Sequence, residues 1–485
     1  YPFTSNTIVI TAMSGVAASL LGGNTTYKKC CLGRNPGVLD IEEYKQTRLL
    51  IVDEISFASG EEVADLHKKL KILMQKRQGF CKFGGLNIVF AGDFRQLEPV
   101  NKSSMYKQKC AEFEWLNYYI ELDGMHRFRT DPEWGLLLKR FRDGLVTMED
   151  IQTINKRCKI SDEHPVPDGI QYASFENRTR DIINTMEFNK YCKENLDDEG
   201  VTKDAVMILS DGLLRMTGES TWKSMDCRKF FYENLGENDL DRAKMKPRVD
   251  PVLRLFRDCP VMLTTNEDLA SGLANGTCAT LEQIIVRPGE VPFLVTMDSG
   301  AKVRALFASQ VDTISLRHER KDIEPQVFGV KCETHTVKAK WPLPEGLRVD
   351  NKKYEQIPMK LNQFAVVRNT CTTGHKLQGK TVQAILIYDF NYATNWPYVV
   401  LSRVRTMAGV YLKSNTRLKQ DLTQYAIPLT LTQMLNRFKD REPQYSDIEE
   451  YYQVAGEDDD FPSPTDNTTV TAQQGASSTL PLVSP

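Results

Sequence analysis

Two polar clusters each follow an apolar run that is typical of a buried strand. Asp53-Glu54 ends the run Arg48–Asp53, and the segment Gly92–Val100 (GDFRQLEPV) follows the run Leu86–Ala91. Open α/β sheets bind ligands beyond the carboxyl ends of their strands. We therefore expect both clusters to lie over one ligand site, on neighbouring strands of one sheet.

The residue types in these clusters suit nucleotide hydrolysis. Asp53 offers a hard oxygen ligand for Mg²⁺ bound to a nucleotide, and Glu54 is placed to orient and deprotonate a water molecule. Gln96 can donate to a phosphate and accept from a water. An acidic residue pair after a strand is also an ordinary strand-to-loop junction, so the second loop is what favours a functional reading.

The elements that must position these residues alternate between strands and helices. Ile8–Ala12 predicts a strand, Ser14-Gly15 a turn and the following alanine-rich stretch a helix, while Glu61–Lys76 has apolar residues at helical spacing. Such alternation predicts an α/β fold with a parallel sheet covered on both faces. Between Thr277 and about Met359, short alternating runs separated by turns predict a small antiparallel barrel.

These patterns divide the chain into successive units. We expect a first α/β domain, the start of a second with a polar segment, a barrel-like insert, the remainder of the second domain, and a disordered acidic and Ser/Thr/Pro-rich tail, at residues 1–150, 151–276, 277–360, 361–454 and 455–485.

Composition limits the function classes. The chain has 485 residues, and 62 Lys+Arg nearly balance 64 Asp+Glu, so any nucleic-acid path must come from local patches. The 11 cysteines include no C-x-x-C pair, which argues against a zinc knuckle and for a reduced, intracellular compartment. No apolar run approaches the roughly 18–20 residues of a membrane span, so no membrane partner is expected.

A series of segments, in order, resembles the motifs of the PIF-family DNA helicases and their RecD-like relatives in superfamily 1B. These segments are Val9–Leu21 (motif Ia), VDEIS (motif II), GDFRQLEPV (motif III), Met125–Trp134 (motif IV), Val261–Thr277 (the "NG" segment), Thr372–Thr381 (motif V) and Tyr398–Leu412 (motif VI). The sequences of motifs IV and V resemble those of the transposon-borne, Helitron-like branch. The resemblance implies two RecA-like P-loop NTPase domains, with an SH3-like barrel inserted in the second.

The resemblance also implies roles at the ATP site. Asp53 would hold Mg²⁺, Glu54 would be the general base, and Gln96 would sense the γ-phosphate, with Gln378 and Gly379 near the ATP.

Two arginines complete the implied ATP site. Arg403 would be the arginine finger, worth roughly 10³–10⁵ in rate. Arg127 would touch the phosphate from motif IV, although Arg129 is equally basic and leaves the register open.

The implied DNA contacts come from motifs Ia and V. They are Thr11, Ser14, Gly15, Thr373, His375 and Lys376. Hydroxyl, imidazole and ammonium groups suit backbone phosphates, which position DNA without reading its sequence. Many relatives have GGxTxH after motif Ia, whereas Gly22–Tyr27 contains no histidine.

The family's P-loop, G-x-x-x-x-G-K-[ST], is not found in this sequence. We expect an N-terminal truncation, the alternative being a remnant that has lost the loop. Either way, this segment alone should bind ATP poorly and hydrolyse hardly any.

The expected function is an ATP-dependent motor that moves 5′ to 3′ on single-stranded DNA and unwinds duplex, acting on DNA junctions. The resemblance fits repair, recombination, telomere maintenance or transposition, in the nucleus or alternatively the mitochondrion; protein partners are not indicated. One alternative is a non-catalytic DNA-binding remnant of a mobile element, against which the intact Asp53, Glu54, Gln96 and Arg403 argue. Another is an RNA-directed or signalling NTPase, against which the ordered motifs argue.

Overall fold

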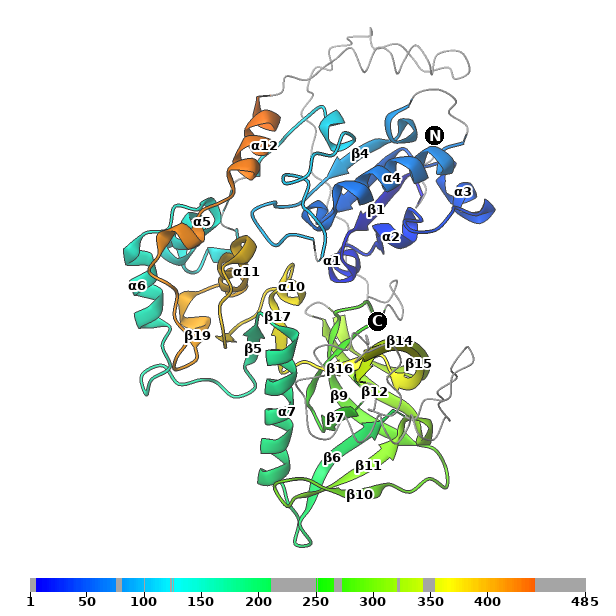
Figure 1. The fold of residues 1–485 in the computed structure, drawn as a ribbon, viewed down its shortest axis with the longest axis vertical. Helices are drawn as coiled ribbons and strands as arrows, with labels where there is room; N and C mark the ends of the chain where they lie inside the picture. Colours follow the sequence, from blue (N-terminus) through cyan, green and yellow to red (C-terminus); the bar gives the residue numbers. More distant parts are fainter. Residues whose placement is uncertain are drawn as a thin grey trace, which may run out of the picture.

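The protein is described here by a computed structural model (Figure 1). The structure describes residues 6–75, 81–99, 101–122, 124, 126–210, 250, 252–265, 273–320, 323–342 and 354–440. The expected tail at 455–485 and most of the polar segment after residue 210 lie outside the described residues. No helix in the described ranges is long and apolar enough to cross a membrane.

The first domain contains a parallel sheet in the order β2-β1-β3-β4. Its strands are β1 (Ile8–Ala12), β2 (Asn24–Thr25), β3 (Leu49–Asp53) and β4 (Asn87–Phe90), and its helices are α1 (Gly15–Leu20), α2 (Thr26–Lys29), α3 (Val38–Tyr44) and α4 (Gly60–Leu73). Ser59 and Glu62 form a capping box at the start of α4. This helix buries its apolar stripe against the sheet, as its periodicity predicts.

Only one face of this sheet is well covered within the described residues. Val9, Leu50 and Val52 are buried, whereas Ile8 and Ile10 on the opposite face of β1 are 39% and 36% exposed. Val89 of β4 is 49% exposed. Parallel sheets almost always bury both faces, which is why the sequence predicts a sheet covered on both sides. In the described residues, one face of this sheet is instead largely open.

The second domain contains a parallel sheet in the order β17-β5-β18-β19. Its strands are β5 (Gln171–Ser174), β17 (Cys371–Thr373), β18 (Ile385–Ile387) and β19 (Val410–Leu412), and its helices are α5 (Pro132–Asp143), α6 (Met148–Arg157), α7 (Asn177–Glu194), α10 (Gly374–Leu377) and α11 (Trp396–Leu401). Helices α5 and α6 share one apolar core with β18 and α11. The second core therefore begins before residue 151, where the sequence had placed the boundary.

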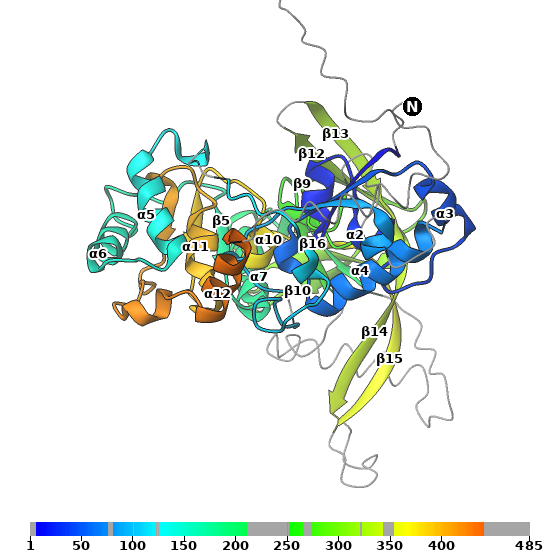
Figure 2. The ribbon, with the colours of Figure 1, turned by 90° about the horizontal axis from the view of Figure 1, so that it is seen from above.

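A β-rich region is inserted between β5 and β17. It has one sheet in the order β10-β11-β6-β7 and another in the order β13-β12-β9-β8-β16. The strands are β6 (Val201–Leu209), β7 (Val252–Phe256), β8 (Pro260–Leu263), β9 (Cys278–Val286), β10 (Phe293–Thr296), β11 (Lys302–Phe307), β12 (Val311–Arg320), β13 (Ile323–Val330) and β16 (Val366–Arg368). A hairpin of β14 (Cys332–Pro342) and β15 (Tyr354–Phe364) projects from it as an arm (Figure 2).

These strands extend beyond the range 277–360 on both sides. Strand β6 is hard to see in the sequence because Lys203 and Asp204 interrupt its apolar alternation. Asp204 has a positive φ of 51°, and the pairing of β6 with β11 shifts register nearby. Such an irregularity breaks the two-residue period on which strand prediction depends.

The chain finally returns to the first domain. Helix α12 (Leu429–Lys439) places Leu431, Met434, Leu435 and Phe438 in the first domain's core. The rings of Phe438 and Phe113 meet edge to face, with centroids 5.4 Å apart. Residues 361–454 are thus not confined to the second domain, as the sequence had suggested.

Candidate active site between the two parallel-sheet domains

Glu54 lies at the carboxyl end of β3 and reaches the second domain. Its backbone adopts a left-handed conformation (φ 54°, ψ 41°), which is unfavourable for a residue with a side chain and clusters at functional sites. Its Oε2 accepts a hydrogen bond of 3.0 Å from Nε2 of Gln378. Burial raises the pKa of Glu54, and this hydrogen bond opposes the rise.

The loops after β3 and β4 lie side by side. The Ile55 N–H donates to the carbonyl of Ala91 at 2.9 Å. A Cβ at Gly92 would be 2.9 Å from the Ile55 nitrogen, so this close approach requires glycine. The polar clusters that follow the two strands therefore share one edge of the sheet, as predicted.

Arg403 approaches this edge from the second domain. It is 2% exposed, and its Nη2 lies 3.4 Å from Oε1 of Gln96. Its Nε donates to the carbonyl of Val399 at 2.6 Å, which fixes the direction of the guanidinium. Burial, reinforced by the neighbouring positive charge of Arg127, lowers the pKa of Arg403 to about 10.

Of the two arginines that the sequence left open, the structure brings Arg127 to this group. Its Nη1 donates to the carbonyl of Ser402 at 2.9 Å, and burial lowers its pKa. Arg129 is exposed and hydrogen-bonds His126 Nδ1 at 2.8 Å instead. We call Glu54, Gln96, Arg127, Gln378 and Arg403 the interdomain junction; Gly379 adjoins it, since a Cβ there would be 3.8 Å from Glu54 Oε1.

The junction's charge suits an anion. Within the described part of the chain, no carboxylate lies within ion-pair distance of Arg127 or Arg403, so the buried Arg403 and the partly buried Arg127 place two positive charges close together. Buried charge is costly unless it is paired, and a polyphosphate would pair both. Gln378 Oε1 is likewise buried and has no hydrogen-bond partner within the described part of the chain. The two arginines fit the phosphates of a nucleoside triphosphate, whereas Gln378 Oε1 is an acceptor and would need a donor such as a water molecule.

Asp53 is the candidate Mg²⁺ ligand at this edge. Its backbone carbonyl accepts from the Met13 N–H at 2.9 Å, and the residue is partly exposed at the end of β3. The described residues include no cluster of three His, Cys, Asp or Glu able to hold an ion. Nucleotide-bound Mg²⁺ commonly takes only one or two carboxylates besides phosphate oxygens and waters, so Asp53 fits that donor set.

The motif Ia residues expected to contact DNA have roles within the fold itself. Thr11 is fully buried; its hydroxyl donates to the Ile51 carbonyl at 2.9 Å and lies 3.1 Å from the Thr26 hydroxyl. Ser14 caps α1 by accepting from the Ala17 N–H at 3.2 Å, and Gly15 is the first residue of that helix. Thr11 is therefore placed as a structural residue rather than as a surface contact.

The motif V candidates lie around α10. Thr373 is the buried N-cap residue of α10, and burial lowers the pKa of His375. Lys376 Nζ donates to Oδ1 of Asn275 at 2.6 Å. A Cβ at Gly276, whose φ is 98°, would lie 2.6 Å from Val16 Cγ2 and 3.8 Å from Lys376 Nζ.

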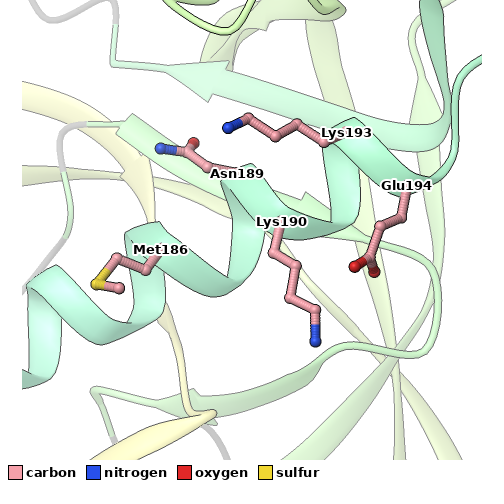
Figure 3. Close-up of a pocket in the computed structure, with 5 residues that line it drawn as sticks. All are labelled: Met186, Asn189, Lys190, Lys193 and Glu194. Carbon is pink, nitrogen blue, oxygen red and sulfur yellow. The ribbon is translucent and has the colours of Figure 1, made fainter.

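Gly276 therefore brings the start of α1 together with motif V. The sequence alone does not single out Asn275 as a functional residue, although the Asn275-Gly276 pair lies in the NG segment. A separate hollow runs along α7, lined by Met186, Asn189, Lys190, Lys193 and Glu194 (Figure 3). It contains no junction residue, and one helix supplies all of these side chains.

Solved structures share this architecture of two parallel-sheet domains. The crystal structure of Pif1 helicase from Candida albicans matches with a TM-score of 0.58 at 20% identity, covering 89% of each chain. That of Bacteroides Pif1 bound to single-stranded DNA matches with a TM-score of 0.58 at 18% identity, covering 93% of this chain and 88% of that one. The fold is that of two RecA-like domains.

The sequence comparisons then give the family. A family model described as PIF1-like helicase matches residues 2–117. The ATP-dependent DNA helicase PIF1 of Danio rerio is 25% identical over 419 residues, which cover 82% of this chain and 53% of that protein. The chain spans about half the length of that relative. With the shared fold, these matches support a PIF-family helicase.

Proposed function

We propose that this chain is the motor region of an ATP-dependent DNA helicase. The observation that carries the proposal is a pair of contacts between the parallel-sheet domains: Glu54 with Gln378 at 3.0 Å, and Gln96 with Arg403 at 3.4 Å. Groups from both domains surround one candidate phosphate position. Occupancy of that position then controls how closely the domains approach, which is how a nucleotide drives mechanical work.

The chain's own residues divide the work of hydrolysis. Bound ATP with Mg²⁺ supplies the phosphoryl group that is transferred to water. Glu54 accepts the proton of that water on its carboxylate, with Gln378 orienting the carboxylate. Arg403, fixed through Val399, stabilises charge on the phosphoryl oxygens, and Gln96 and Arg127 read the γ-phosphate.

We further propose that an upstream segment carrying the P-loop completes the first domain. The open face of the first sheet, with Ile8, Ile10 and Val89 exposed, supports this because a strand-helix unit would cover it. The chain without that segment should hydrolyse ATP hardly at all.

The substrate that we propose is single-stranded DNA, on which the motor moves 5′ to 3′, including strands at DNA junctions. The crystal structure of Bacteroides Pif1 bound to single-stranded DNA supports this choice, because that protein shares the fold of this chain. Repair, recombination, telomere maintenance or transposition in the nucleus, or in the mitochondrion, are the corresponding roles.

A non-catalytic DNA-binding remnant is the competing proposal. It gives no reason for Glu54 to keep a left-handed backbone or for Arg403 to stay buried beside Gln96. Strain and buried charge persist where function requires them.

The test is ATP hydrolysis by the full-length protein, with and without single-stranded DNA, followed by unwinding of duplexes that carry a 5′ or a 3′ tail. We expect DNA-stimulated hydrolysis and unwinding only from the 5′ tail. DNA binding without stimulated hydrolysis would instead support a non-catalytic DNA-binding remnant. Unwinding from the 3′ tail would show that the motor moves 3′ to 5′.

A further inference from the structure

The loop Gly92–Glu98 of the first domain is held by the second domain on several sides. Leu97 is 1% exposed and belongs to the second domain's apolar core, which also contains Trp134 and Leu138 of α5. Asn395 Nδ2, at the start of α11, donates to the Arg95 carbonyl at 3.0 Å. The loop is thus docked on the second domain rather than lying free at the strand end.

A chain of polar contacts runs through this loop. Arg142 Nε, near the end of α5, donates to Asp93 Oδ2 at 3.1 Å. The same carboxylate oxygen lies 3.5 Å from Gln96 Nε2, and Asp93 Oδ1 accepts from the Arg95 N–H at 3.0 Å. Gln96 Oε1 faces Arg403 at 3.4 Å.

This arrangement fixes which way the Gln96 amide points. A carboxylate attracts the NH₂ end of an amide and a guanidinium attracts its oxygen, so Asp93 and Arg403 prescribe the same orientation. Asp93 is in turn held by Arg142, which is partly buried. Charge-assisted hydrogen bonds of this kind are stronger and more directional than neutral ones.

We infer that Arg142 is a positioning residue: through Asp93 it holds the Gly92–Glu98 loop and orients the Gln96 amide toward Arg403. The inference rests on the proposed function for its consequence in hydrolysis, but not for the loop's attachment. Arg142 touches neither of the two polar groups that it aligns, and it belongs to the second domain. The orientation of the Gln96 amide in the first domain therefore depends on contact with the second domain.

Arg140 offers a matched control on the same helix. Its Nε donates to Asp150 Oδ2 at 2.8 Å, and that pair lies wholly within the second domain. Arg140→Gln removes the same charge from α5 without touching the loop. Arg142→Lys keeps the charge but loses the planar donor geometry.

The first experiment follows amide hydrogen exchange of residues 93–98 in the full-length protein. Arg142→Gln should speed exchange there at least several-fold, Arg142→Lys should be intermediate, and Arg140→Gln should match wild type. Unchanged exchange in Arg142→Gln overturns the inference. This measurement needs no ATP hydrolysis, so it decides the inference even if the helicase proposal fails.

The second experiment compares hydrolysis kinetics. Arg142→Gln should lower kcat about 10- to 100-fold with little change in KM for ATP, because misplacing a group by about 1 Å can cost that much. In a Gln96→Ala background the same change should have no further effect, since there is no amide left to orient. Additive losses, or equal losses in Arg140→Gln, show a merely structural role and overturn the inference.

Discussion

The interdomain junction and the proposed DNA-contact residues of motifs Ia and V differ in how they are arranged. In the junction, side chains from both parallel-sheet domains converge within hydrogen-bond distance, as Glu54 does with Gln378 and Arg403 with Gln96. Among the proposed DNA-contact residues, Lys376 Nζ donates to Asn275 Oδ1, whereas Thr11 is fully buried within β1.

The difference fits the two tasks proposed for these groups. Phosphoryl transfer stabilises charge at one point, so its groups must surround that point. A nucleic-acid strand is contacted at intervals along its backbone, and each contact contributes modestly. A single junction substitution should therefore abolish function, whereas a single DNA-side substitution should only weaken binding.

The largest effect is expected at Arg403. Arg403→Ala should lower DNA-stimulated kcat of the full-length protein by roughly 10³–10⁵, because the transition state loses its buried cation. The exposed Arg405 is the control, and Arg405→Ala should stay within a few-fold of wild type in the same steady-state assay. Equal losses in both variants would refute a special role for Arg403.

The second largest loss of activity is expected at Glu54, together with a characteristic pH dependence. Glu54→Gln should lower kcat by roughly 10²–10⁴ while retaining ATP binding. Burial raises the pKa of Glu54, and a protonated carboxyl cannot accept a proton, so the wild-type rate should fall as the pH drops through that raised pKa. If the residual rate of Glu54→Gln shows the same fall, another group is responsible for it.

Lys376 tests whether DNA is bound through several separate contacts. Lys376→Ala should weaken single-stranded DNA binding by a few-fold and reduce the slope of log K against log salt by about 1. Fluorescence anisotropy titrations at several salt concentrations measure both quantities. Loss of all DNA binding from this one change would contradict a distributed surface.

Thr11 should have the smallest effect. Thr11→Val removes the hydroxyl that bonds the Ile51 carbonyl, which should lower the free energy of unfolding by about 1 kcal/mol. DNA affinity should be unchanged. Urea denaturation of this chain, paired with the same anisotropy assay, separates the outcomes; weakened DNA binding at unchanged stability would restore Thr11 as a contact.

The comparison also shows what sequence can predict. The placement of Asp53-Glu54 and Gln96 at one sheet edge followed from strand ends, a local pattern with a general rule. The choice between Arg127 and Arg129 depended on a contact with Ser402, far along the chain, which no local pattern encodes. Likewise, nothing in the sequence of α5 distinguishes Arg142, which faces Asp93, from Arg140, which faces Asp150.

Domain boundaries were harder for a related reason. The amphipathic pattern of helix α5 shows that one face is buried. It does not show which of the two sheets that face packs against. The same holds for α12, whose apolar stripe meets Phe113 rather than the adjacent second domain.

The return of α12 to the first domain has a mechanical consequence. The polypeptide passes between the parallel-sheet domains once between Tyr119 and Asp131, and passes back between Leu412 and Leu429. Arg437 with Glu114, at 2.7 Å, anchors the second passage close to where the first departs. Two covalent connections restrict the relative motion of the two domains more than a single one would. A protease cut in either connection alone would leave the halves joined.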